Sequence, residues 1–190
     1  MFIDYLSLML INLVAGFVLL ATFVYFGLEG KNPKRWIPGF GMTGIIALIT
    51  GFHTVFNWIL PSSYNIAFGE LSVLFGIVFL GASVALAQGW DLHTVTLYAF
   101  FAGLAAILIG VRVISLGMTK ASLLSGIGFI FSGLGGVFAA PTLYWHLNSR
   151  LKLIGATILM VAALIWAFNG YQAYWDHLEA YLKWMPSTMR

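Results

Sequence analysis

Glu70 and Arg112 are ionisable residues that stand inside otherwise apolar stretches of the sequence. Glu70 lies in SYNIAFGELSVLFGIVFLGASVAL, residues 63–86, and Arg112 lies in YAFFAGLAAILIGVRVISLG, residues 98–117. A charged side chain at the centre of a membrane helix costs roughly 2.5–3.5 kcal/mol on insertion scales, so it usually faces protein or water and has a partner. We therefore expect a Glu70–Arg112 ion pair, which either ties two helices together or lines a polar site.

Further polar side chains occur within the apolar stretches. They are His53, Asn57, Asn169 and Asn12. A histidine is able to change its charge near neutral pH, and amides commonly form hydrogen bonds between membrane helices. These side chains predict either interhelical hydrogen bonds or, with the two charged residues, a polar chamber for a solute.

The composition indicates the kind of element that must position these residues. Of 190 residues, 61% are hydrophobic and only 8% are charged, whereas a soluble domain has roughly 25% charged residues. A bilayer core about 30 Å thick is crossed by about 20 apolar residues in a helix. The apolar runs are continuous, which disfavours the alternating pattern of a membrane barrel.

The polar breaks divide the chain into six apolar segments, which predicts an all-α, polytopic membrane protein. We place the helices near residues 6–28, 40–60, 66–87, 95–116, 123–143 and 151–174. The short loops predict antiparallel neighbours in one bundle over residues 1–174. Residues 175–190 are predicted to form an amphipathic tail along the membrane interface.

The loop charges predict how the chain is oriented in the cell membrane. One side collects the basic residues Lys31, Lys34, Arg35, Arg150 and Lys152. Cytoplasmic loops carry an excess of lysine and arginine, so both termini are expected outside. Counted along the helices, the polar residues named above then gather in the outer half, with Asn12 a little deeper.

Glycines and aromatic residues form the second pattern. There are 21 glycines, and small residues allow membrane helices to approach closely. Close packing explains such a pattern, but glycine surfaces also leave room for a narrow solute path. We expect the aromatic constriction of such a path at Phe75, Phe79, Phe101 and Trp166.

Several function classes are disfavoured by what the sequence lacks. It contains none of the motifs GxSxG, phosphate loop or HExxH, and it has no cysteine, so we expect no enzyme and no thiolate metal site. The depths of the histidines offer no obvious pair for a haem, and no cofactor or metal is expected. The basic residues fall mainly in loops, where membrane orientation explains them better than nucleic-acid binding does.

The sequence resembles two membrane families. The runs LPSSYNIAFGELSVLFG, YAFFAGLAAILIGVRVISLG and LIWAFNGYQAYWDHLE are similar to an uncharacterised six-helix family of bacteria and archaea, over nearly the whole chain. More distantly, FGELSVLFGIVFLGASVALAQGWDLHTVTLYAFFAGL, residues 68–104, resembles the urea and amide channel family. That resemblance implies a homo-oligomer, commonly a hexamer, with one pore for a small neutral solute in each protomer. The channels carry acidic residues in their last two helices, and the corresponding apolar segments here have none, which disfavours urea itself.

The sequence thus favours a channel or facilitator for a small neutral or protonated solute, of the urea, amide or short-acid class. Its partners would be the lipid bilayer, the solute and further copies of the chain. A non-catalytic membrane subunit or quinone-binding module of a respiratory complex is the alternative. A purely structural assembly factor is a third possibility.

Overall fold

The computed structural model describes residues 5–28, 30, 32–145 and 148–184, and within them every regular element is helical. The predicted all-α fold is therefore confirmed. The chain begins with α1 (Leu6–Thr22), prolonged by the π-helical turn η1 (Phe23–Gly27), and continues with η2 (Pro33–Trp36) and α2 (Ile37–Asn57). The π-helical segment η3 (Asn65–Glu70) leads into α3 (Leu71–Gln88), which is followed by α4 (His93–Leu116), α5 (Ser122–Val137), α6 (Ala139–Tyr144) and α7 (Ser149–Ala180).

Six of the resulting helical spans are long and apolar enough to cross a membrane. They are Leu6–Gly27, Pro33–Asn57, Asn65–Gln88, His93–Leu116, Ser122–Tyr144 and Ser149–Ala180. These spans indicate a multi-pass membrane protein. The second span begins seven residues earlier than predicted, at Pro33, because η2 precedes α2. The last span ends six residues later than predicted, since α7 continues without interruption to Ala180 and residues 175–180 contain neither glycine nor proline. The remainder of the predicted tail, beyond Trp184, lies outside the described residues.

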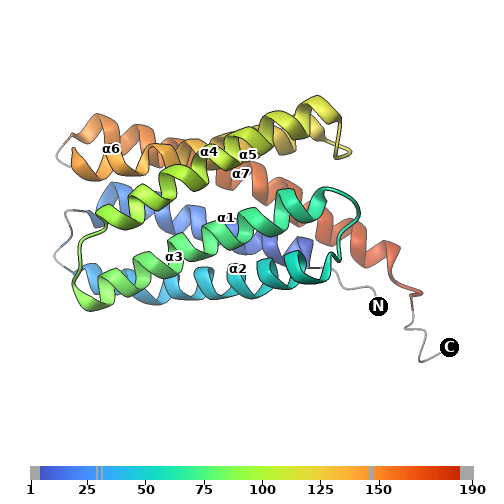
Figure 1. The fold of residues 1–190 in the computed structure, drawn as a ribbon, viewed down its shortest axis with the longest axis horizontal. Helices are drawn as coiled ribbons and strands as arrows, with labels where there is room; N and C mark the ends of the chain where they lie inside the picture. Colours follow the sequence, from blue (N-terminus) through green and yellow to red (C-terminus); the bar gives the residue numbers. More distant parts are fainter. Residues whose placement is uncertain (1–4, 29, 31, 146–147, 185–190) are drawn as a thin grey trace.

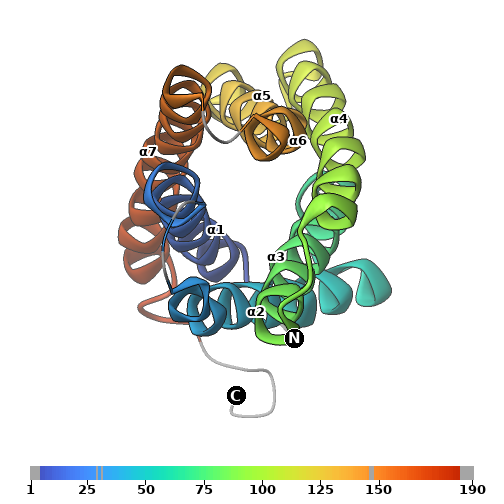
Figure 2. The same ribbon diagram turned by 90° about the vertical axis from the view of Figure 1, so that its left-hand side faces the viewer.

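The helices form a ring (Figures 1 and 2). Each helix from α1 to α5 packs against the next in the chain, α6 prolongs α5, and α7 closes the ring by packing against both α5 and α1. Neighbours around the ring are antiparallel, as the short loops predicted. We call one end of the ring the Tyr64 end, where α1 begins and α7 ends, and the other the Trp36 end, where α2 begins.

Glycines allow the closest helix contacts in the ring. A Cβ atom added to Gly103 of α4 would lie 2.4 Å from the carbonyl oxygen of Gly133 of α5, and one added to Gly133 would lie 2.4 Å from the oxygen of Gly103. Backbone therefore meets backbone at this crossing. The α2–α3 pair is built the same way, since a Cβ at Gly44 would lie 2.6 Å from the Leu80 nitrogen. The glycine pattern thus marks helix packing, as the sequence suggested.

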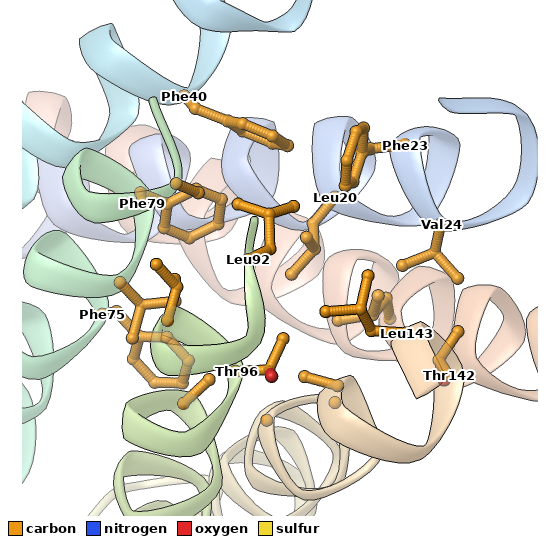
Figure 3. A pocket seen from close by; sticks show the side chains of 18 of the residues that line it. Leu20, Phe23, Val24, Phe40, Phe75, Phe79, Leu92, Thr96, Thr142 and Leu143 are labelled. Carbon is orange, nitrogen blue, oxygen red and sulfur yellow. The ribbon is translucent and has the colours of Figure 1, made fainter. Parts of the chain in front are cut away.

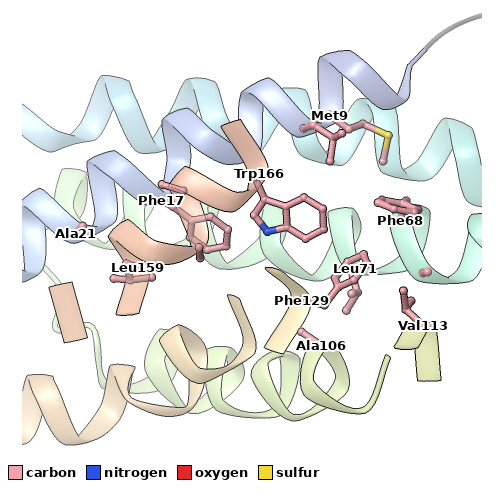
Figure 4. Close-up of a cluster of buried hydrophobic side chains, with 14 of the residues drawn as sticks. Met9, Phe17, Ala21, Phe68, Leu71, Ala106, Val113, Phe129, Leu159 and Trp166 are labelled. Carbon is pink, nitrogen blue, oxygen red and sulfur yellow. The ribbon is translucent and has the colours of Figure 1, made fainter. Parts of the chain in front are cut away.

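Aromatic side chains fill much of the inside of the ring. At the Trp36 end, Phe23, Trp36, Phe40 and Phe79 form one buried cluster. Nearer the Tyr64 end, Phe68, Phe129 and Trp166 form the centre of another, larger cluster (Figure 4). The spaces left between these side chains form the candidate site.

Candidate functional site

Three cavities follow one another between the two ends of the ring. We call them the vestibule, the middle cavity and the apolar cavity. The vestibule is at the Tyr64 end and is lined by Thr119, Lys120, Asn169, Gln172, Asp176, His177 and apolar neighbours. The middle cavity is lined by Met9, Leu10, Asn12, Thr43, Ser72, Phe75 and surrounding residues. The apolar cavity lies towards the Trp36 end, between Leu20, Phe23, Phe79, Leu92, Thr96 and Leu143 (Figure 3).

The inner cavities are small. The middle cavity leaves about 30 Å³, and the apolar cavity about 80 Å³, for the centres of water-sized molecules. One water needs roughly 10–15 Å³ by this measure. The middle cavity therefore holds at most a couple of small molecules, whereas the apolar cavity has room for several.

Trp166 separates the vestibule from the middle cavity. Its side chain is only 1% exposed, and Leu10, Phe68 and Trp166 line both spaces. The Trp166 ring centroid lies 4.8 Å from that of Phe129 and 6.3 Å from that of Phe68 (Figure 4). The indole Nε1–H donates to Ser132 Oγ at 2.8 Å. This hydrogen bond holds the indole ring between the two spaces, and the aromatic side chains form a narrow partition.

A second partition separates the middle cavity from the apolar cavity. Phe75, Phe79 and Ser132 line both spaces. Phe75 packs edge-on against Phe17 with ring centroids 5.7 Å apart, and Phe79 packs against Phe40 at 5.8 Å. Ser132 donates its hydroxyl hydrogen to the Gly128 carbonyl at 2.7 Å. The two partitions are therefore linked through Ser132.

The structure places the predicted aromatic residues unequally. Phe75, Phe79 and Trp166 line the cavities inside the ring. Phe101 does not, because it lies on the outer face of α4 and is 64% exposed. Its prediction as a constriction residue is wrong. Successive side chains of an α-helix are rotated by about 100°, and it is the neighbouring Ala102, only 3% exposed, that lines the apolar cavity.

Glu70 and Arg112 do not form an ion pair within one chain, so this prediction is also wrong. Among the described residues the ion pair present joins His93 and Asp91, and both Glu70 and Arg112 are exposed. Arg112 Nη1 instead donates to Ser115 Oγ on its own helix at 3.3 Å. Equal depth along two helices does not fix the direction in which their side chains point.

The polar residues predicted for a chamber are divided among several places. Asn12 lines the middle cavity and donates to the Thr43 carbonyl at 3.0 Å, and Asn169 lines the vestibule while donating to Ile165 O at 2.9 Å. Asn57 is exposed and donates to the backbone of its own helix. His53 packs against the Tyr5 ring, with centroids 4.8 Å apart, and lines none of the three cavities. The vestibule is built mainly from the C-terminal part of α7 and the loop between α4 and α5.

Asp91 and His93 form a polar feature at the Trp36 end, before and at the start of α4. The His93 backbone N–H donates to Asp91 Oδ1 at 2.9 Å, and the imidazole Nδ1 lies 3.0 Å from the same oxygen. These hydrogen bonds, the backbone one foremost, hold the pKa of Asp91 below its ordinary value. The carboxylate therefore stays charged at neutral pH and anchors the start of α4.

Asn65 is a structural residue that the sequence did not single out. Its side chain is fully buried and is bonded to both the N–H and the carbonyl of Leu60 and to the carbonyl of Ser62 at 3.0 Å. Ser62 has a φ of 50°, an uncommon backbone conformation for a residue with a Cβ. Asn65 thereby shapes the α2–α3 loop from which the π-helical turn carrying Phe68 starts.

Replacing Asn65 with leucine is expected to lower the free energy of unfolding by at least about 2 kcal/mol, because each buried group left unsatisfied costs about 1–3 kcal/mol. Thermal unfolding in detergent measures the effect. Asn57→Leu is the control, since Asn57 is exposed and bonds only within its own helix. Equal stability of the two variants would contradict the role given to Asn65.

Comparison with known families gives one match. A family model described as "Protein of unknown function (DUF981)" matches residues 1–180. No curated protein and no solved structure matches the chain. The match therefore identifies a family without assigning an activity.

Proposed function

The chain belongs to the DUF981 family of proteins of unknown function, and we propose that it is a facilitator that lets small neutral solutes pass along the axis of its helix ring. The solute enters the vestibule, passes the Trp166 partition and the Phe75–Phe79 partition, and leaves through the apolar cavity at the Trp36 end. No chemical turnover is part of this function. The Tyr64 end faces the outside of the cell, and the basic loop containing Lys34 and Arg35 faces the cytoplasm, following the positive-inside rule.

The observation that carries the proposal is the sharing of walls between successive cavities. The vestibule and the middle cavity share Leu10, Phe68 and Trp166. The middle cavity and the apolar cavity share Phe75, Phe79 and Ser132. Side chains therefore separate these spaces, so the passage of a solute requires them to rotate, including Trp166 with its hydrogen bond to Ser132. A bundle built for packing alone has few voids larger than a water molecule.

The cavity walls favour weakly hydrated solutes. No ionisable side chain lines the middle cavity or the apolar cavity among the described residues. Several of their polar groups are already committed, since Ser132, Thr142 and Thr96 each donate to a backbone carbonyl of their own helix. An amide transferred to an apolar medium without new hydrogen bonds costs about 4–8 kcal/mol. Dissolved gases and molecules with one hydrogen-bonding group therefore fit these walls better than urea does.

The vestibule supplies the polar surroundings in which a solute loses its water. Lys120, Asn169, Gln172 and Asp176 line it, so it offers both donors and acceptors. Because the next wall is aromatic, the hydrated part of the path ends there. Selection among solutes thus depends on the free energy of the hydrogen bonds with water that each solute loses between the vestibule and the middle cavity.

A second candidate is the binding of an apolar chain, such as that of a quinone. The apolar cavity favours it, because aromatic and aliphatic side chains make up most of its wall. A ligand of that kind would remain with the protein during purification. Organic extraction followed by mass spectrometry distinguishes the two candidates.

The expected result for the facilitator is selective permeability in reconstituted liposomes of low intrinsic permeability. Ammonia uptake, measured with an internal pH dye, should rise several-fold when the protein is present, whereas urea uptake, measured by light scattering, should rise little. Equal increases for both solutes would overturn the solute class. Unchanged uptake of both, with a bound quinone in the extract, would favour the second candidate.

A further inference from the structure

Glu70 and Arg112 are exposed on the outer surface of the ring, although both belong to apolar spans. A carboxylate or guanidinium group that faces lipid is unfavourable, and charged residues in membrane helices normally pair with one another or face water. Glu70 and Arg112 form no ion pair with each other or with another described residue. The contacts within a single chain therefore do not explain why two charged residues lie on this surface.

The two residues lie at the same level of the ring. Glu70 comes five residues after Asn65, the first residue of its span, and Arg112 comes four residues before Leu116, the last residue of its span. At about 1.5 Å per helical residue, both are within about 8 Å of the Tyr64 end. Glu70 is the last residue of η3, which leads directly into α3, and Arg112 belongs to α4. The helices α3 and α4 are neighbours in the ring (Figure 2).

We propose that the outer face of α3 and α4 binds a second copy of this chain about a two-fold axis that runs parallel to the ring axis. Glu70 of each copy pairs with Arg112 of the other. A two-fold axis in this direction keeps every residue at its own level, so only groups at equal level are able to pair across it. The interface is self-complementary, and the pair forms twice.

The rest of this face suits helix packing. Outward-facing residues of the continuous η3–α3 span recur at Glu70, Ile77 and Val84, and those of α4 recur at Leu97, Phe101, Leu104 and Leu108. Spacings of three, four and seven residues are those of helices that pack side chain into groove. Lipid alone would accommodate the apolar residues, but it does not explain the two opposite charges among them.

A groove on the same face offers room for side chains of the second copy. It lies between α3 and α4 towards the Trp36 end and is lined by Ile77, Leu80, Gly81, Val84, Trp90, Val95 and neighbouring residues. Gly81 leaves its floor open, because an added Cβ would come no closer than 3.7 Å to another atom. The large exposed residues of the other copy's α4 are of the apolar kind that this groove would accept.

Cysteine cross-linking tests the interface directly, because the chain contains no cysteine of its own. Differently tagged chains carrying Glu70→Cys and Arg112→Cys are expressed together and oxidised in the membrane. We expect a mixed disulfide dimer in high yield. The control pair is Leu164→Cys with Phe168→Cys on the exposed face of α7, and it should give little product. A yield no higher than this control would overturn the proposal.

A chain carrying both Glu70→Cys and Arg112→Cys reports the symmetry. A two-fold interface closes at the dimer, whereas a ring such as the hexamer implied by the urea-channel resemblance gives a ladder of larger products. A ladder would therefore overturn the two-fold arrangement.

Exchange of the charges tests the ion pair itself. Glu70→Arg should shift the protein from dimer to monomer in sedimentation experiments in detergent, and Glu70→Arg combined with Arg112→Glu should restore the dimer. The alternative is that Arg112 contacts lipid phosphates, which long basic side chains are able to reach. The wild-type protein would then sediment as a monomer. That result would overturn the proposal in favour of lipid contact.

Discussion

Replacement of Gly103 with alanine is expected to destabilise the protein severely, whereas the same replacement at Gly81 leaves it folded. At Gly103 the new methyl group would lie 2.4 Å from the Gly133 carbonyl oxygen and 2.9 Å from the Val137 nitrogen. Both are backbone atoms, so no side-chain rotation relieves the overlap, and α4 and α5 must move apart. Alanine improves helix propensity by about 1 kcal/mol, which is smaller than the cost of the overlap.

The size of the effect follows from the packing of the ring. Overpacking a site lowers the free energy of unfolding by about 1–3 kcal/mol, and occasionally more. For Gly103→Ala we expect a loss at the upper end of this range, because the displaced groups are backbone. At Gly81 the nearest atom is a Val95 methyl group 3.7 Å away, which is an ordinary contact. Thermal unfolding and size-exclusion profiles in detergent compare the two variants. A Gly103→Ala protein as stable and monodisperse as Gly81→Ala would show that α4 and α5 do not meet at this crossing.

The helices of the fold are predictable from the sequence because apolar length is a strong and local signal. The six predicted segments match the six spans in number and position. Their ends are less well determined, since residues 175–180 continue α7 where a separate tail was expected. An amphipathic segment that follows an apolar helix without a breaker does not reveal whether the helix ends.

The rotation of each helix about its own axis was not part of the prediction, and this explains the errors at the site. Counting residues placed Glu70 and Arg112 at one depth, but the angle of each side chain about its helix depends on packing. Both proved to face outwards. Phe101 was misplaced for the same reason, because α4 is apolar on every side and its sequence does not reveal which face packs inwards.

Two of the residues that the sequence did not single out lie in irregular structure. Phe68 belongs to the π-helical segment Asn65–Glu70, where the spacing of side chains differs from that of an α-helix. Asn65 was not recognised because its partners, Leu60 and Ser62, are backbone groups of a loop. By contrast, Trp166, Phe75 and Phe79, which the sequence named, line the cavities inside the ring, and their role in a constriction stays a prediction.

Filling the apolar cavity is expected to abolish most of the facilitated flux without unfolding the protein. Ala82 of α3 lines this cavity, and a phenyl ring at its position would occupy space that a solute needs. An added barrier of about 1.4 kcal/mol lowers a rate about tenfold, so the expected loss is at least of that size. Ala87→Phe is the matched control, because Ala87 belongs to the same helix and is exposed on its outer surface.

The most direct test of the axial path is therefore ammonia uptake by liposomes that contain equal amounts of the wild-type protein, Ala82→Phe or Ala87→Phe. Thermal unfolding of each protein beforehand shows that the folds are intact. The path along the ring predicts that Ala82→Phe falls to nearly the uptake of protein-free liposomes while Ala87→Phe keeps the wild-type rate. Wild-type uptake by a folded Ala82→Phe protein would show that solute does not travel through the ring.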